Sequence, residues 1–121
     1  MTVISFEVRG NDMVMCTQSG IVKTAPTAKQ VDGYVEFLNV QWDFSYVYLL
    51  DFADNTGVFS GEKMMLKDFI FSAVPPVFSV IDQTYGYNTT KYGGYLTVNG
   101  RFCECFIEIY HEGDMVFVAE E

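Results

Sequence analysis

The chain has 121 residues with 16 acidic and 7 basic side chains, a formal net charge of -9, and 50% of its residues are hydrophobic. So apolar a composition excludes a disordered chain, and the length suits one domain, residues 1–121, that can bury a core without a disulfide or a metal. The acidic charge repels phosphate, so we expect no direct binding to nucleic acid and none to a membrane surface.

Short runs of alternating apolar and polar residues recur from end to end, and Gly, Asn, Asp or Pro separate them. The run 46–52 is apolar at nearly every position, which is typical of a central strand that is covered on both faces. Residues 62–68 fit a short helical turn or an edge strand equally well. The predicted strands are residues 2–8, 13–18, 21–24, 34–40, 46–52, 69–73, 77–82, 95–98, 101–110 and 115–119.

The clearest local signal is Asn99-Gly100, which lies between two strand-like runs. This dipeptide suits the two positive φ angles of a type I′ turn and therefore predicts a β-hairpin. In the second strand of the hairpin, one predicted face is apolar and the other mixes aromatic with acidic residues. The first face holds Cys103, Cys105, Ile107 and Ile109, and the second holds Phe102, Glu104, Phe106, Glu108 and Tyr110.

Eight to ten short strands with connections too short for crossover helices predict an all-β fold. We expect an antiparallel β-sandwich, immunoglobulin-like, or a small barrel. Cys16, Trp42 and Cys103 follow one another in the order of the cysteine pair and tryptophan of an immunoglobulin-type domain. The spacing differs from that of antibodies, and a reducing compartment disfavours a disulfide between them.

No motif of a known catalytic or phosphate-binding site occurs in the chain, so we expect no enzyme and no cofactor. The single histidine, His111, lies in a Gly-Asp-flanked segment and is predicted to be an exposed turn residue. Cys16, Cys103 and Cys105 lack the paired spacing of a zinc site, so we expect buried free thiols and no bound metal.

The segment 83–95 is rich in tyrosine spaced by Gly, Asn and Thr, the composition of adaptable recognition loops. The candidate partner-binding residues are Tyr85, Tyr87, Asn88, Tyr92 and Tyr95. The alternative is a long hairpin whose tyrosines lie over the core of the domain itself.

The first residues have no basic stretch before an apolar run, so we expect no secretion by a signal peptide. No apolar run approaches the roughly 20 residues that span a bilayer. We therefore expect the protein in a host cytoplasm or in a particle assembled there.

The segments 6–12, 35–43 and 75–80 resemble small immunoglobulin-like modules of phage baseplate and tail proteins. In those modules a first strand ends in a Gly-polar turn (Phe6 to Asp12 here), an acid-flanked tryptophan follows (Trp42-Asp43), and a proline leads a later strand (Pro75-Pro76). The resemblance covers about half of the chain and implies assembly through protein contacts. Because it implies no catalysis, it assigns no functional residue.

Three hypotheses follow from the sequence. The first is a non-enzymatic structural or adaptor protein of a phage-like particle, which contacts other protein subunits, including copies of itself. The second is a small acidic inhibitor of a basic, nucleic-acid-handling host enzyme, which requires acids gathered on one face. The third is a carbohydrate- or ligand-binding module that uses the tyrosine-rich segment.

Overall fold

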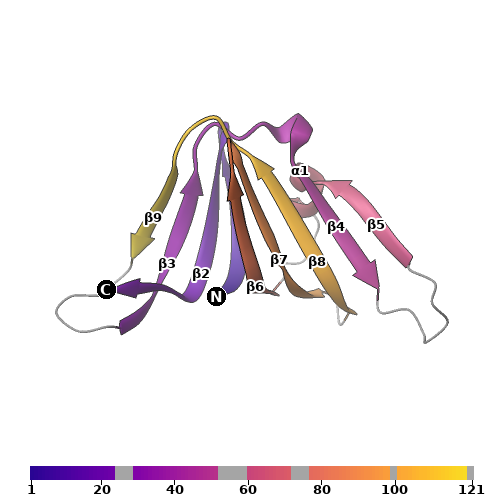
Figure 1. The fold of residues 1–121 in the computed structure, drawn as a ribbon, viewed down its shortest axis with the longest axis horizontal. Helices are drawn as coiled ribbons and strands as arrows, with labels where there is room; N and C mark the ends of the chain where they lie inside the picture. Colours follow the sequence, from indigo (N-terminus) through magenta and orange to yellow (C-terminus); the bar gives the residue numbers. More distant parts are fainter. Residues whose placement is uncertain (24–28, 52–59, 72–76, 99–100, 120–121) are drawn as a thin grey trace.

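The computed structural model describes residues 1–23, 29–51, 60–71, 77–98 and 101–119. These residues form nine β-strands, one short α-helix and one 3₁₀ turn (Figure 1). In chain order the elements are β1 (Thr2–Arg9), β2 (Asp12–Lys23), β3 (Lys29–Phe37), η1 (Trp42–Phe44), β4 (Tyr46–Asp51), β5 (Ser60–Met65), α1 (Leu66–Ile70), β6 (Val77–Gly86), β7 (Thr89–Val98), β8 (Arg101–Tyr110) and β9 (Met115–Ala119).

The nine strands form one sheet in the order β5-β4-β8-β7-β6-β1-β2-β3-β9, and every neighbouring pair is antiparallel. Strands β5 and β9 are its edges and lie on opposite flanks of the molecule (Figure 1). The prediction of an all-β, antiparallel fold is confirmed. Five of the eight connections join neighbouring strands, because an antiparallel pair needs only a turn between its strands, whereas β3 to β4, β5 to β6 and β8 to β9 connect strands that are not neighbours.

The sheet curves until distant strands touch. The rings of Phe37 on β3 and Tyr92 on β7 meet edge to face, with centroids 6.3 Å apart. Three strands, β6, β1 and β2, separate β3 from β7 in the sheet. The bend is placed at β1 and β6, which pair only at Thr2 with Ser79 and at Val3 with Phe78. A β-bulge follows Val3, and such bulges increase the local twist.

The core lies on the inner face, which we define as the side of the sheet that the curve encloses. Strand alternation places every second residue there, and the buried cluster draws on β1 to β4 and β6 to β8. Helix α1 covers one side of this cluster with Leu66 and Phe69, which are 0% and 3% exposed. The Phe69 ring packs edge to face against Phe6 of β1, with centroids 5.9 Å apart. Helix α1, although short, thus completes the core on this side of the sheet.

The predicted elements of the middle segment divide between strand and helix. Residues 60–65 form edge strand β5, and α1 begins at Leu66, so both alternatives for 62–68 hold in part. The predicted strand at 69–73 is wrong for its three described residues, because Phe69 and Ile70 belong to α1 and Phe71 is the C-cap of this helix. On this helix the Phe69 side chain packs into the core. Residues 72–76, with the two prolines, lie outside the described residues.

Both predicted hairpin regions form antiparallel pairs. Strands β7 and β8 pair through Val98 and Arg101, as the Asn-Gly signal predicts, although residues 99–100 lie outside the described residues. Strands β6 and β7 form a second hairpin, which turns at Tyr87-Asn88, where Asn88 has φ 55°. The segment 83–95 is therefore a hairpin and not an extended loop.

His111 is buried, and the prediction of an exposed turn residue is wrong. Its side chain is 9% exposed and packs at 5.3 Å, centroid to centroid, against the Phe37 ring. The ring Nδ1 donates to the Gly113 carbonyl at 2.9 Å, and Nε2 lies 2.9 Å from the Thr90 hydroxyl. A backbone bridge pairs His111 with Val40 at the end of the β3 segment. The histidine thus joins two parts of the fold that are distant in the sequence.

Candidate binding face

Strand β8 carries apolar side chains on both faces of the sheet. The inner set, Cys103, Cys105, Ile107 and Ile109, is fully buried. On the outer face, across the three strands β8, β7 and β6, large apolar side chains remain exposed by 38–57% of their surface. We call this group the aromatic face: Val77, Tyr95, Phe102, Phe106 and Tyr110.

Register places Val77, Tyr95 and Phe102 in neighbouring rows, whereas Phe106 and Tyr110 follow along β8 with Glu104 and Glu108 between the rings. Thr97 of β7 lies between Val77 and Phe102, and Tyr95 lies one row further along β7. The rings of Tyr95 and Phe102 stack with centroids 5.6 Å apart and planes 11° apart. Because the two rings support each other while both remain partly exposed, they form a preformed aromatic surface.

A pocket of about 530 Å³ lies beside this surface, at the position where β7 has a glycine. Gly93 pairs with Phe106 on one side and with Asp82 on the other, so the row lacks a side chain between them. Ring carbons Cε1 and Cδ1 of Phe106 lie 3.0 and 3.1 Å from the position that a β-carbon at Gly93 would take. The phenyl ring therefore leans across the β7 backbone, and the space on the far side of the glycine stays open.

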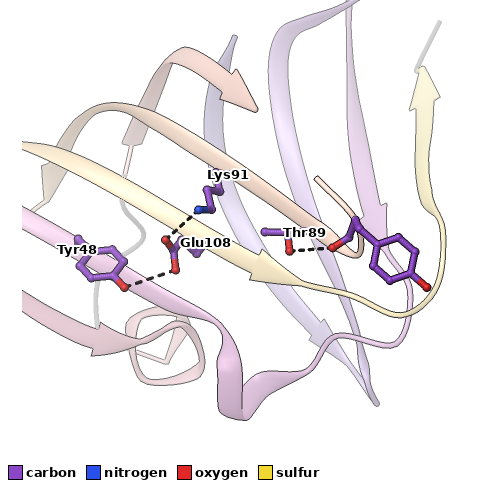
Figure 2. A network of polar contacts seen from close by, with 5 residues as sticks. Tyr48, Thr89, Lys91 and Glu108 are labelled. Carbon is purple, nitrogen blue, oxygen red and sulfur yellow. Dashed lines mark hydrogen bonds and ion pairs between the residues drawn. The ribbon is translucent and has the colours of Figure 1, made fainter. Parts of the chain in front are cut away.

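Polar side chains surround the pocket and are connected to one another (Figure 2). The Tyr48 hydroxyl donates to Glu108 Oε2 at 3.4 Å, and Lys91 Nζ lies 3.6 Å from Glu108 Oε1. Lys63 extends the charged group onto β5, where its Nζ lies 4.1 Å from the centre of the Tyr46 ring. The ion pair is half exposed on its lysine side, so it orients the carboxylate more than it stabilises the fold.

A smaller pocket of about 220 Å³ continues this one toward the β6–β7 turn and shares Thr84 and Lys91 with it. Tyr85 and Tyr110 contribute to its walls. At the turn, the Thr89 hydroxyl donates to the Tyr87 carbonyl at 3.2 Å (Figure 2). The two pockets together make a depression along the outer face of β6, β7 and β8.

The predicted partner-binding residues do not gather in one surface. Tyr87 is 93% exposed at the turn with Asn88, and the Tyr85 hydroxyl donates to Gln83 Oε1 at 2.6 Å. Tyr92 lies on the same face of the sheet as Tyr85 in the register but is 1% exposed in the core, as the alternative interpretation of the segment expected. Tyr95 belongs to the aromatic face. Burial, with a smaller contribution from Tyr85, holds the pKa of Tyr92 far above its usual value.

The sequence singled out the aromatic residues on the outer face of β8 but not the pocket beside them. Tyr48, Asp82, Lys91 and Glu108 come from four strands, so no linear motif contains them. One signal was available. A glycine within a strand often marks a place where another group approaches the backbone closely, and Gly93 is such a position.

The three cysteines are free thiols, with Cys103 and Cys105 buried and Cys16 partly exposed. Burial, and next the adjacent Cys103, raises the pKa of Cys105 to about 12. A thiol held in this neutral form is a poor nucleophile and a poor metal ligand. Within the described ranges, no three His, Cys, Asp or Glu side chains are grouped to hold a metal ion.

Comparison with protein-family models, with curated proteins and with solved structures found no match for this chain. Among the residues that the structure describes, no helix is long and apolar enough to cross a membrane.

Proposed function

We propose that this chain is a non-enzymatic structural or adaptor protein that acts through protein–protein contacts in a larger, phage-like particle. The observation that carries the proposal is the aromatic face. It places several large apolar side chains together on one side of the sheet, beyond those that the core requires.

Two properties of this face support a protein partner. Aromatic side chains are enriched at protein interfaces because they bury a large area with few rotatable bonds. Contiguous apolar surface on a free monomer costs solubility, so such a patch marks an interaction site. The -9 net charge keeps the free chain soluble until the face is covered.

The phage-like particle and an immunoglobulin-like arrangement of the strands come from the resemblance of segments 6–12, 35–43 and 75–80. Both are parts of the proposal, and residence in a virion or a host cytoplasm belongs to it as well. An assembly of copies of this chain and an assembly with other subunits would both use the aromatic face.

The two alternatives draw less support from the described residues. Acidic side chains such as Glu7 on β1 and Glu108 on β8 lie on the outer face, but exposed rings alternate with the acids of β8, whereas an inhibitor of a basic enzyme needs an acidic surface there. A carbohydrate site formed by the four tyrosines together requires Tyr92 to leave the core.

Two experiments test the proposal. Sedimentation velocity on the purified chain, from micromolar to near-millimolar concentration, measures self-association. Electron microscopy of particles made by co-expression with the neighbouring genes shows whether the chain is incorporated. We expect Phe102→Lys to abolish self-association or incorporation, because the charge would be buried at the contact. Phe44→Lys is the matched control, since Phe44 is 61% exposed but lies on η1, outside the aromatic face.

A chain that stays monomeric at the highest concentration and is absent from the particles would contradict the proposal. Equal effects of Phe102→Lys and Phe44→Lys would contradict the assignment of the aromatic face. Both variants must keep the amide spectrum of the folded protein, which separates loss of contact from loss of fold.

A further inference from the structure

We propose that the pocket at Gly93 binds a neutral saccharide, one or a few sugar units of a glycan. The site shares Phe106 with the aromatic face but extends from it over β7 and β6, and its polar residues Asp82, Lys91 and Glu108 are not among the predicted partner-binding residues. Its volume of about 530 Å³ lies within the roughly 300–1,000 Å³ typical of small-molecule sites.

The polar groups around the pocket include both hydrogen-bond donors and acceptors. Lys91 offers ammonium protons, Thr84 offers a hydroxyl that both donates and accepts, and Asp82 and Glu108 offer carboxylate oxygens. Sugar hydroxyls donate and accept as well, so each of these groups can be satisfied by the same ligand. A mixed set of this kind fits a polyhydroxylated molecule better than a ligand with one type of polar group.

Charge argues for a neutral ligand. Two carboxylates, Asp82 and Glu108, repel anions, while Lys91, which lies between Thr84 and Glu108 in the register, repels a partner's lysine or arginine. The Lys91–Glu108 contact at 3.6 Å already neutralises one of the carboxylates. Asp82 is exposed and makes no hydrogen bond or ion pair with the residues that the structure describes, so it remains available as an acceptor.

The apolar side of the pocket suits the C–H face of a sugar ring. Phe106 leans over Gly93, and Tyr48 stands next to Phe106 in the same row. A pyranose packed on these rings gains many weak dispersion contacts and buries its aliphatic hydrogens. Gly93 matters to this geometry, because a side chain there would displace the Phe106 ring from its position over the β7 backbone.

Amide NMR titration of the full chain tests the site with neutral trisaccharides of glucose, galactose, mannose or N-acetylglucosamine. We expect at least one of them to bind and to shift the amide signals of Asp82, Lys91 and Gly93. Asp82→Asn should weaken the binding by about tenfold, because a hydrogen bond to a charged acceptor is lost. The matched control is Asp68→Asn, which makes the same change at an exposed position of α1. It should leave the dissociation constant unaltered.

Phe106→Ala should also weaken the binding, whereas Phe44→Ala on η1 should not. If Phe106→Ala fails to fold, Asp82→Asn decides alone, since it keeps the shape of the side chain. Phe102→Lys should bind the trisaccharide as the unaltered chain does, and this separates the pocket from the protein contact.

Absence of shifts with every trisaccharide would overturn the inference. So would equal affinities of Asp82→Asn and Asp68→Asn. A tri-arginine peptide serves as the competing probe, and shifts at Gly93 with this peptide alone would assign the pocket to a basic partner instead.

Discussion

The inner and outer faces of β8 differ in what covers their apolar side chains. Ile107 on the inner face is fully buried by the core, whereas its neighbour Phe106 on the outer face keeps 38% of its surface exposed. The same strand thus supplies one set of residues for folding and another for contact. The contrast teaches that the apolar content of a strand does not by itself separate stability from binding.

The N-terminal part of the sheet shows that an apolar residue on the outer face need not be exposed. Val14 of β2 alternates with the core residues Met13 and Met15, yet it is only 1% exposed. Glu7 of β1 and Glu36 of β3 are its partners in the register. Long side chains can cover a small neighbour with their methylene groups, which is not possible for the larger rings on β8.

The largest expected difference between the two faces is in stability. Ile107→Ala should lower the free energy of unfolding by about 2–5 kcal/mol, because it leaves a cavity in the core. Phe106→Ala should lower it by about 1 kcal/mol or less, since the ring is partly in water already. Urea unfolding measures both. Equal losses would mean that the outer ring is part of the folding core.

Two adjacent glycines of β7 provide the next test. A β-carbon at Gly94 would collide with the backbone carbonyl of Ser79, where β6 has a bulge. Since backbone cannot rotate aside, Gly94→Ala should cost about 3 kcal/mol or more. Gly93→Ala should cost about 1 kcal/mol, because only the end of the Phe106 side chain has to move. Thermal unfolding of the two variants compares their losses of stability. A larger loss in Gly93→Ala than in Gly94→Ala would contradict the close approach of the Ser79 backbone to Gly94.

Alkaline pH should lower the free energy of unfolding through the buried thiol of Cys105 on the inner face. The folded chain holds the proton of Cys105 up to a pKa of about 12, against an ordinary value of 9.0, so above pH 9.0 the folded state binds more protons than the unfolded state. Stability is therefore fully present below pH 9.0 and falls as pH rises toward about 12. Urea midpoints across this range measure the loss. Cys105→Ala should reduce the slope, and an unchanged slope would exclude this thiol as a cause.

Local patterns in the sequence predicted most of the strands but not the contacts between them. The alternation of 101–110 and the hairpin that Asn-Gly predicts depend on neighbouring residues, and the structure has strand β8 over this range, paired with β7. The burial of His111 depends on Val40 and Phe37, more than 70 residues earlier in the chain. A turn-like neighbourhood cannot reveal contacts that a distant strand makes.

The candidate site was predictable to a similar extent. The aromatic residues of β8 followed from alternation, and the hairpin alternative for 83–95 correctly placed Tyr92 over the core. The pocket required the register of β6, β7 and β8, since Asp82, Gly93 and Phe106 meet only when three strands are aligned. A shift by one residue would send every second side chain to the other face, so no composition argument finds such a site.

The smallest expected effect concerns hydroxyl groups on the two faces. The Tyr92 hydroxyl is buried on the inner face with no hydrogen-bond partner among the described residues, whereas the Tyr48 hydroxyl donates to Glu108. Tyr92→Phe should therefore leave stability unchanged or raise it by about 1 kcal/mol, because it removes a buried polar group that lacks a partner. Tyr48→Phe should lower it by about 0.5 kcal/mol, the lower end of the range for a hydrogen bond. Urea unfolding of both variants makes the comparison. A clear loss in Tyr92→Phe would show that an ordered water satisfies the hydroxyl, and the inner face would then be less dry than its apolar lining indicates.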